Sequence, residues 1–85
     1  MHIELYTKSR CAFCTKAKAI LDINFLSYTT IKMQETEMEQ GTGFISREDM
    51  IIKFPTAKTM PIVIVDGSYI GGFEELRTML QAELA

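Results

Sequence analysis

The sequence lacks a long apolar run, an excess of basic residues and a signal-peptide pattern at its start. A membrane-spanning helix needs about 20 apolar residues, and no stretch approaches that length. The opening "MHIELYTK" has neither the basic segment nor the apolar core of a signal peptide. The formal net charge of −2 disfavours a broad nucleic-acid-binding surface, which normally carries a clear basic excess. We therefore expect a soluble, cytoplasmic protein that binds neither membranes nor nucleic acids.

Cysteine is also scarce, because the chain has only Cys11 and Cys14, and its one histidine is His2. Small secreted disulfide scaffolds usually carry about four or more cysteines. A disulfide across so short a loop removes little entropy from the unfolded chain, so the pair would be a poor structural staple. A structural zinc site usually needs about four Cys or His ligands, more than one molecule supplies. Redox chemistry is therefore favoured over a staple or half of a metal site.

The hydrophobic content of 47% over 85 residues fits one small domain spanning residues 1–85. Residues 2–7 alternate apolar and polar side chains and predict a strand, in which Tyr6 is expected to be a packing residue. From Phe13 the apolar residues follow a helical spacing that ends near residues 22–24. Residues 25–31 are rich in β-formers and predict a second strand, which completes a right-handed βαβ unit.

The second half of the chain is less uniform. Residues 32–43 are polar and acidic, and both a solvated helix and a loop remain open for them. Residues 46–54 predict a short helix with Ser46 as its N-cap, ended by Pro55. Residues 61–65 are apolar without alternation, which predicts a central strand buried on both faces.

The C-terminal part predicts a hairpin followed by a helix. Asp66-Gly67 is a turn signal, and Tyr69-Ile70 begins a short antiparallel return strand. The rest of the chain, residues 71–85, predicts an amphipathic helix. Its apolar side consists of Phe73, Leu76, Leu80 and Leu84. The expected order is β-α-β-α-β-β-α.

The cysteine pair has the features of a reactive dithiol. A thiol is nucleophilic only as the thiolate, and its ordinary pKa of about 8.5 leaves little thiolate at neutral pH. Cys11 is expected at the start of the first helix, where free N–H groups, the helix dipole and the nearby Lys8, Arg10 and Lys16 favour a negative charge. Cys14 follows at i+3 on the same face, so one thiol can attack a disulfide and the other can resolve the intermediate. A CxxC pair in a βαβ unit is the thioredoxin-type pattern.

A second block, "TMPIVIVDGSYIGGFEEL" at residues 59–76, resembles the glutaredoxin pattern of T-V-P, strand, turn, strand and G-G-x-x-D/E-L. The stretch "YTKSRCAFC" resembles the aromatic-Thr-Lys segment that leads into the cysteines of the same family. The short length and the Thr-Met-Pro variant look most like small glutaredoxins of bacteria and bacteriophages. The resemblance covers about the first and last thirds of the chain. It implies a thioredoxin-like α/β fold with a four-stranded mixed sheet flanked by about three helices.

The resemblance also implies site residues. Cys11 and Cys14 become the catalytic pair, with Cys11 as the exposed nucleophile and Cys14 as its resolver. Pro61 corresponds to the family's cis-proline beside the active cysteine. The backbone of Thr59-Met60 would run alongside the peptide part of glutathione, as an added strand does. The implied glutathione-binding set is Lys8, Phe13, Thr59, Met60, Pro61, Gly71, Gly72, Phe73 and Glu74.

The other members of this set have distinct expected roles. The Gly71-Gly72 pair would let glutathione approach the backbone, and the N–H groups of Phe73 and Glu74 suit its γ-glutamyl carboxylate. The Glu74 side chain is expected to cap the helix or to meet the glutathione ammonium. Lys8 is placed to pair with the glycine carboxylate, and Phe13 provides an aromatic wall where relatives have Tyr.

The implied activity is glutathione-dependent thiol–disulfide exchange on protein disulfides and glutathionylated proteins, with a role in electron transport and cell redox homeostasis. Glutathione is the expected co-substrate, ribonucleotide reductase is a protein client suggested by the family, and the protein is expected to be a monomer without a metal. Ala12 stands where the family usually has Pro, a replacement associated with an iron–sulfur cluster bound between two protomers through the first Cys and glutathione. A cluster carrier that uses Cys11 is therefore one alternative. A thioredoxin-like reductase is another, disfavoured by the absence of Trp and of Gly-Pro between the cysteines.

Overall fold

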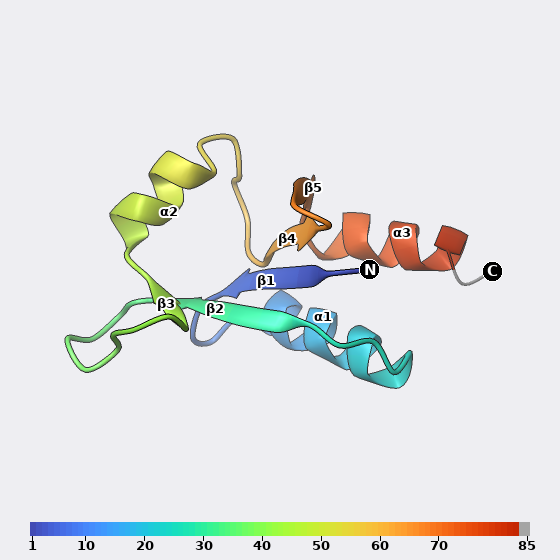
Figure 1. The fold of residues 1–85 in the computed structure, drawn as a ribbon, viewed down its shortest axis with the longest axis horizontal. Helices are drawn as coiled ribbons and strands as arrows, with labels where there is room; N and C mark the ends of the chain where they lie inside the picture. Colours follow the sequence, from blue (N-terminus) through green and yellow to red (C-terminus); the bar gives the residue numbers. More distant parts are fainter. Residues whose placement is uncertain (84–85) are drawn as a thin grey trace.

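A computed structural model describes residues 1–83 as a twisted five-stranded sheet with helices on both faces (Figure 1). The strand order is β3-β2-β1-β4-β5, in which β1, β2 and β3 run parallel and β4 and β5 run antiparallel to their neighbours. The sheet is therefore mixed, as expected for a thioredoxin-like fold. The elements are β1 (Ile3–Thr7), α1 (Ala12–Ile23), β2 (Thr29–Met33), β3 (Phe44–Ile45), α2 (Arg47–Lys53), β4 (Ile62–Val65), β5 (Ser68–Gly71) and α3 (Phe73–Glu83).

One face of the sheet packs against α1 and α3. Ile3 and Leu5 of the central strand β1 point to this face and are essentially fully buried, because alternate residues of a strand face the same side. The two helices cover them with the apolar stripes that the sequence predicts. The buried members of this core are Ile3, Leu5, Ala17, Leu21, Val63, Leu76 and Leu80.

The opposite face is covered by the short helix α2, which lies at the left end of the sheet in Figure 1. Tyr6 of β1 is buried there with Met50 of α2 and Ile62 and Ile64 of β4, which confirms its packing role. The ring of Phe54 packs edge-on against Tyr6 with centroids 4.8 Å apart. Because α2 has only 7 residues, it covers only part of this face.

The structure corrects two expectations in the middle of the chain. The second strand occupies Thr29–Met33 rather than residues 25–31, because Phe25 takes a left-handed φ of 56° and its N–H bonds to Asp22 O in the turn that ends α1. The sheet has five strands, not four, because β3 pairs in parallel with the end of β2. The order is therefore β-α-β-β-α-β-β-α, and the segment between β2 and β3 is a loop with turns rather than a helix.

The structure confirms the predicted start of α2 and the predicted turn between β4 and β5. Ser46 is the N-cap of α2, and its Oγ accepts a hydrogen bond from Asp49 N–H at 3.0 Å. Asp66 and Gly67 both have positive φ angles, 50° and 85°, as a tight hairpin between β4 and β5 requires. The expected position of Leu84 on the apolar face of α3 lies outside the described residues. Within residues 1–83, no helix is both long and apolar enough to cross a membrane.

Candidate active site

Cys11 and Cys14 are joined by a disulfide at the start of α1. Cys11 is the N-cap residue with extended backbone angles, and its Sγ accepts a hydrogen bond from Cys14 N–H at 3.2 Å. This N–H is one of the free donors of the first helical turn, so the same geometry would stabilise a Cys11 thiolate after reduction. Cys14 is only 2% exposed, whereas Cys11 is partly exposed. The pair is therefore unequal in access, with Cys11 as the sulfur that a substrate can reach.

The loop before Cys11 consists of the exposed residues Lys8, Ser9 and Arg10. Arg10 has a left-handed φ of 54°, a conformation that costs a non-glycine residue about 1–2 kcal/mol. The Ser9 N–H donates to Glu35 Oε1 at 2.8 Å. The backbone that leads into Cys11 therefore turns at Arg10. One residue earlier, the Ser9 N–H is hydrogen-bonded to Glu35, which is distant in the sequence.

A second part of the site is the segment Thr59-Met60-Pro61, where the Met60–Pro61 peptide bond is cis, as the resemblance implies. Pro61 is buried, and Met60 is partly buried. Gly72 lies directly against this segment: a Cβ atom built on it would be 3.4 Å from Pro61 O and 3.5 Å from Thr59 Oγ1. The fold therefore brings together the Thr-Met-Pro and Gly-Gly motifs, which are separate in the sequence.

The start of α3 corrects one expectation. Glu75, not Glu74, caps the helix: its Oε1 accepts a hydrogen bond from Gly72 N–H at 2.7 Å, while Glu74 pairs with Arg77 at 2.8 Å. The helix begins at Phe73, so Glu75 occupies the third helical position that reaches back to the N-cap residue. The role of Glu74 toward a glutathione ammonium stays a prediction.

A pocket of about 260 Å³ opens beside the Thr-Met-Pro segment and contains Lys8, Thr59 and Met60 of the predicted set. Arg47 and Lys58 also line it, and no acidic residue does. Sequence reasoning missed both cations. Lys58 could have been found because it precedes Thr59, but Arg47 could not, since its place depends on how α2 packs. The apolar lining residues are Met33, Met50, Ile51, Phe54, Ala57 and Ile62.

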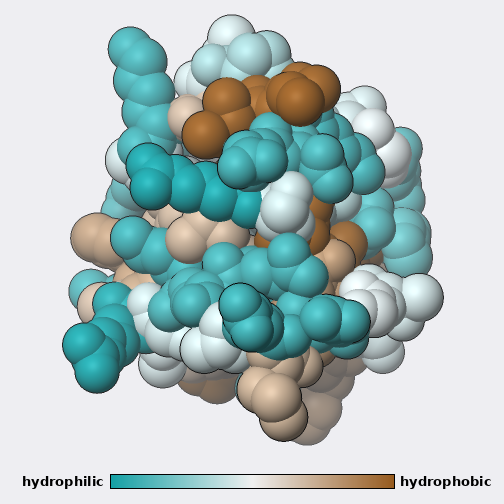
Figure 2. Space-filling model, turned by 90° about the vertical axis from the view of Figure 1, so that its left-hand side faces the viewer, coloured by the Kyte–Doolittle hydropathy of each residue, from teal (hydrophilic) through white to brown (hydrophobic). Residues whose placement is uncertain are grey.

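The surface at this end of the molecule is mostly hydrophilic, with a hydrophobic patch at the top of the view in Figure 2. Ile51 and Ile52 of α2, which lies at the top left of Figure 1, are 54% and 77% exposed. Within residues 1–83, no group of three or more His, Cys, Asp or Glu side chains could hold a metal ion.

A thioredoxin-like fold that presents a CxxC pair at the start of its first helix defines a thiol–disulfide oxidoreductase. The chain belongs to the glutaredoxin family, because the family model described as Glutaredoxin matches residues 3–70. It is 32% identical to Glutaredoxin 1 of Rickettsia conorii over 74 residues, which cover 87% of this chain and 67% of the relative. It is 31% identical to Glutaredoxin 3 of Escherichia coli K12 over 75 residues, covering 88% and 81%.

Solved structures agree on the fold. Glutaredoxin 1 from Francisella tularensis, crystallised with cacodylate, superposes with a TM-score of 0.76 at 20% identity, covering 98% of this chain and 95% of that one. Reduced Escherichia coli glutaredoxin superposes with a TM-score of 0.70 at 20% identity, covering 99% and 98%. The predicted family and thioredoxin-like fold are thereby confirmed.

Proposed function

We propose that this glutaredoxin-family protein uses glutathione to reduce protein disulfides and glutathione mixed disulfides. The proposal rests on how the fold brings the predicted residues together. Gly72 lies against Thr59 and Pro61. Beside them, Lys8, Thr59 and Met60 line one pocket. These residues belong to the predicted glutathione-binding set and come from three separate stretches of the chain.

The tripeptide glutathione fits this region by charge and by backbone geometry. Its glycine carboxylate would be attracted by Lys8, Arg47 and Lys58, which line one pocket without an acidic neighbour. Its peptide part would run along Thr59-Met60 by strand addition. The N–H groups of Phe73 and Glu74 at the start of α3 would meet the γ-glutamyl carboxylate, because that helix end carries a partial positive charge.

The proposed exchange begins on the reduced pair. The Cys11 thiolate forms a bond to one sulfur of the client disulfide, and the other client sulfur leaves as a thiolate that takes up a proton. Cys14, deprotonated, then attacks Cys11 Sγ, which releases the second client thiol and leaves the Cys11–Cys14 disulfide. The client gains the two electrons that the pair loses. Two glutathiones then reduce the pair and leave as glutathione disulfide.

For a glutathionylated client, the proposal needs only one thiol. The Cys11 thiolate attacks the glutathione sulfur, and the client leaves as a thiol. A second glutathione then attacks the Cys11–glutathione disulfide, which frees Cys11 and forms glutathione disulfide. Among protein clients, we propose disulfide-bearing and glutathionylated proteins, with ribonucleotide reductase as a candidate. The proposed location is the cytoplasm, where glutathione keeps such a pair reduced, and the proposed state is a monomer.

A glutathione-coupled assay on a small mixed disulfide tests the proposal. Cys11→Ser should abolish turnover, whereas Cys14→Ser should keep substantial activity because the one-thiol route remains. Equal loss in both variants would contradict that route. Efficient reduction of the oxidised protein by thioredoxin reductase, but not by glutathione, would instead favour a thioredoxin-like reductase.

The cluster-carrier alternative rests on Ala12, whose backbone N–H a proline would lack. Cys11 is the more accessible thiol of the pair, so an iron–sulfur cluster would need further ligands from glutathione and a second protomer. Brown colour and visible absorbance after anaerobic purification with glutathione, together with a dimer, would support this alternative. A colourless monomer under the same conditions would count against it.

A further inference from the structure

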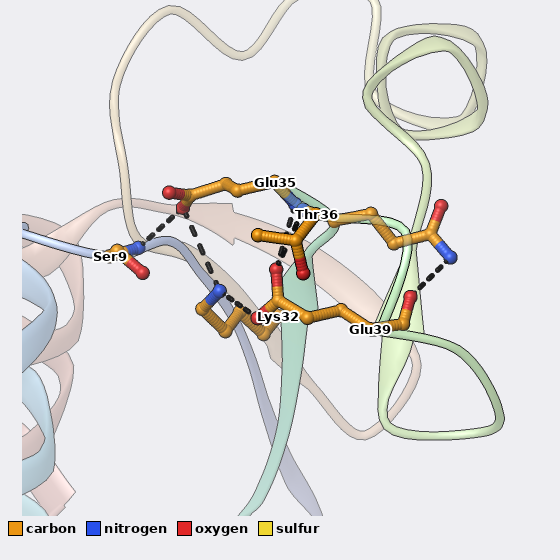
Figure 3. A network of polar contacts seen from close by, with 6 residues as sticks. Ser9, Lys32, Glu35, Thr36 and Glu39 are labelled. Carbon is orange, nitrogen blue, oxygen red and sulfur yellow. Dashed lines mark hydrogen bonds and ion pairs between the residues drawn. The ribbon is translucent and has the colours of Figure 1, made fainter.

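The loop after β2 is folded around one carboxylate, that of Glu39 (Figure 3). Its Oε1 accepts hydrogen bonds from Glu35 N–H at 2.9 Å and Thr36 N–H at 3.1 Å, and its Oε2 pairs with Lys32 Nζ. The side-chain amide of Gln34 donates to the backbone carbonyl of Glu39 at 2.6 Å. The segment of residues 34–39 is thus a loop in which the N–H groups of Glu35 and Thr36 bond to Glu39 Oε1, and the N–H of Glu39 bonds back to Thr36 O at 3.2 Å.

This loop fixes the position from which the Glu35 side chain extends. The Glu35 carboxylate reaches across to the loop before α1 and accepts the Ser9 N–H at 2.8 Å, as the dashed line in Figure 3 shows. Lys32 Nζ lies 3.9 Å from the same oxygen. Because Ser9 is two residues before Cys11, the contact joins a segment 26 residues away to the backbone that presents the accessible sulfur.

We propose that Glu35 is a positioning residue for Cys11 and acts through the Ser9 amide. Ser9 lies in an exposed loop that contains the left-handed Arg10, a conformation that the loop can relax when it is not held. A hydrogen bond from an amide to a carboxylate is stronger than one between neutral groups, so this contact opposes that relaxation. Cys11 then keeps its N-cap geometry, in which Cys14 N–H points at its sulfur.

Two substitutions separate position from charge. Glu35→Gln keeps an oxygen that can accept the Ser9 N–H but removes the negative charge, whereas Glu35→Ala removes both. Since both variants lose the same charge, any difference between them reports the hydrogen bond. Glu37→Ala is the matched control, because Glu37 is exposed in the same loop and accepts a hydrogen bond only through its backbone carbonyl, from Gln40 at 2.8 Å.

The first measurement is amide hydrogen exchange at Ser9 in the full chain. The exchange rate should rise about tenfold or more in Glu35→Ala, as expected for the loss of a charge-assisted hydrogen bond, and by less than about threefold in Glu35→Gln. Amides of β1 should exchange as in the wild type in all variants. Unchanged Ser9 exchange in Glu35→Ala would overturn the proposal.

The second measurement is the pH profile of alkylation of Cys11 by iodoacetamide, in a Cys14→Ser background that leaves one thiol. We expect the pKa of the Cys11 thiol to be higher in Glu35→Ala than in Glu35→Gln, so that alkylation below both pKa values is about threefold slower or more. Glu37→Ala should follow the wild-type profile. Coincident profiles for the two Glu35 variants, or an equal change in Glu37→Ala, would overturn the proposal.

Alkylation requires no glutathione, so this test is independent of the proposed function. If the protein fails the glutathione-coupled assay but the Glu35 variants differ as predicted, the glutathione proposal is wrong and the positioning role of Glu35 stands. The converse result would keep glutathione as co-substrate and assign Glu35 only to loop stability. Thermal unfolding of the same variants would detect a loss of fold in Glu35→Ala. In that case Glu35→Asp replaces it, because its side chain is one methylene shorter and keeps the charge while losing the reach to Ser9. Exchange at Ser9 should then be faster in Glu35→Asp than in Glu35→Gln, and equal exchange in the two would overturn the proposal.

Discussion

The rings of Phe13 and Phe73 lie with their centroids 5.9 Å apart, in a tilted arrangement that joins the first turn of α1 to the first turn of α3. Phe13 is 50% exposed, and the ammonium of Lys16 lies 5.0 Å from its ring centroid. The aromatic pair therefore connects the helix start that holds the cysteines to the helix start proposed to hold the γ-glutamyl carboxylate. Phe13 therefore has a structural contact in addition to its proposed role as the aromatic wall of the glutathione site.

Phe13→Ala should weaken both properties. Loss of the ring contact should destabilise the fold by about 1 kcal/mol, and loss of the wall should raise the KM for glutathione severalfold. Phe13→Tyr keeps the ring and should retain near wild-type values. Urea unfolding and the glutathione-coupled assay measure the two effects. An unchanged KM in Phe13→Ala would remove Phe13 from the proposed glutathione-binding set.

The cations that line the pocket should control affinity for an anionic co-substrate. Arg47→Ala and Lys58→Ala should each raise the KM for glutathione severalfold, because each removes an attraction for its glycine carboxylate. The wild-type KM should also rise with salt, since partly exposed charges are screened. Lys18→Ala, a change on α1 away from the pocket lining, is the control. If Lys18→Ala has the same effect as the pocket variants, the assignment of Arg47 and Lys58 is wrong.

Gly71 should tolerate no side chain. Its φ is 129°, and a Cβ atom built on it would lie 2.5 Å from the Glu75 side chain that caps α3. Gly71→Ala should therefore destabilise the protein by about 1–3 kcal/mol through backbone strain and a displaced cap. Gly43→Ala is the matched control, because its added Cβ meets nothing within 4 Å. Urea unfolding should show the difference, and equal stabilities would contradict it.

The parts of the fold and of the site that could be predicted are those determined by residue type and short spacing. The CxxC pair, Ser46 as an N-cap and the Asp66-Gly67 turn each depend on chemistry within a few residues, and all three occur as predicted. The cap of α3 was missed by one residue. Once Phe73 is known as the first helical residue, the spacing of a capping box selects Glu75.

The parts that could not be predicted depend on contacts between distant segments. Phe25 has a high β-propensity, yet it is 95% exposed in a left-handed turn, because pairing with β1 begins only at Thr29. The strand β3 has two residues and exists through its pairing with the end of β2. The contact of Glu35 with Ser9 likewise has no local pattern. Glu35 belongs to the polar, acidic stretch of residues 32–43, and only the fold places its carboxylate beside the loop before Cys11.

The stability of the loop around Glu39 should depend on pH. The hydrogen bond from Lys32, followed by the backbone N–H of Glu35, holds the pKa of Glu39 below its ordinary value. A carboxyl with a lowered pKa in the folded state contributes stability that is fully present above its unfolded pKa of about 4.3 and is lost as pH falls through the folded value.

Glu39→Gln, which cannot ionise, should therefore be less stable than the wild type at pH 7, and the difference should narrow between about pH 5 and pH 3. Urea unfolding of both proteins across this range measures the difference in the free energy of unfolding. Glu37→Gln removes one charge from the same loop outside the network and controls for net charge. Amide exchange at Glu35 and Thr36, whose N–H groups bond to Glu39, should accelerate only a few-fold in Glu39→Gln at pH 7, because the side-chain amide oxygen can still accept from them but is neutral. A stability difference that stays constant from pH 7 to pH 3 would contradict a role for the ionised Glu39 carboxylate.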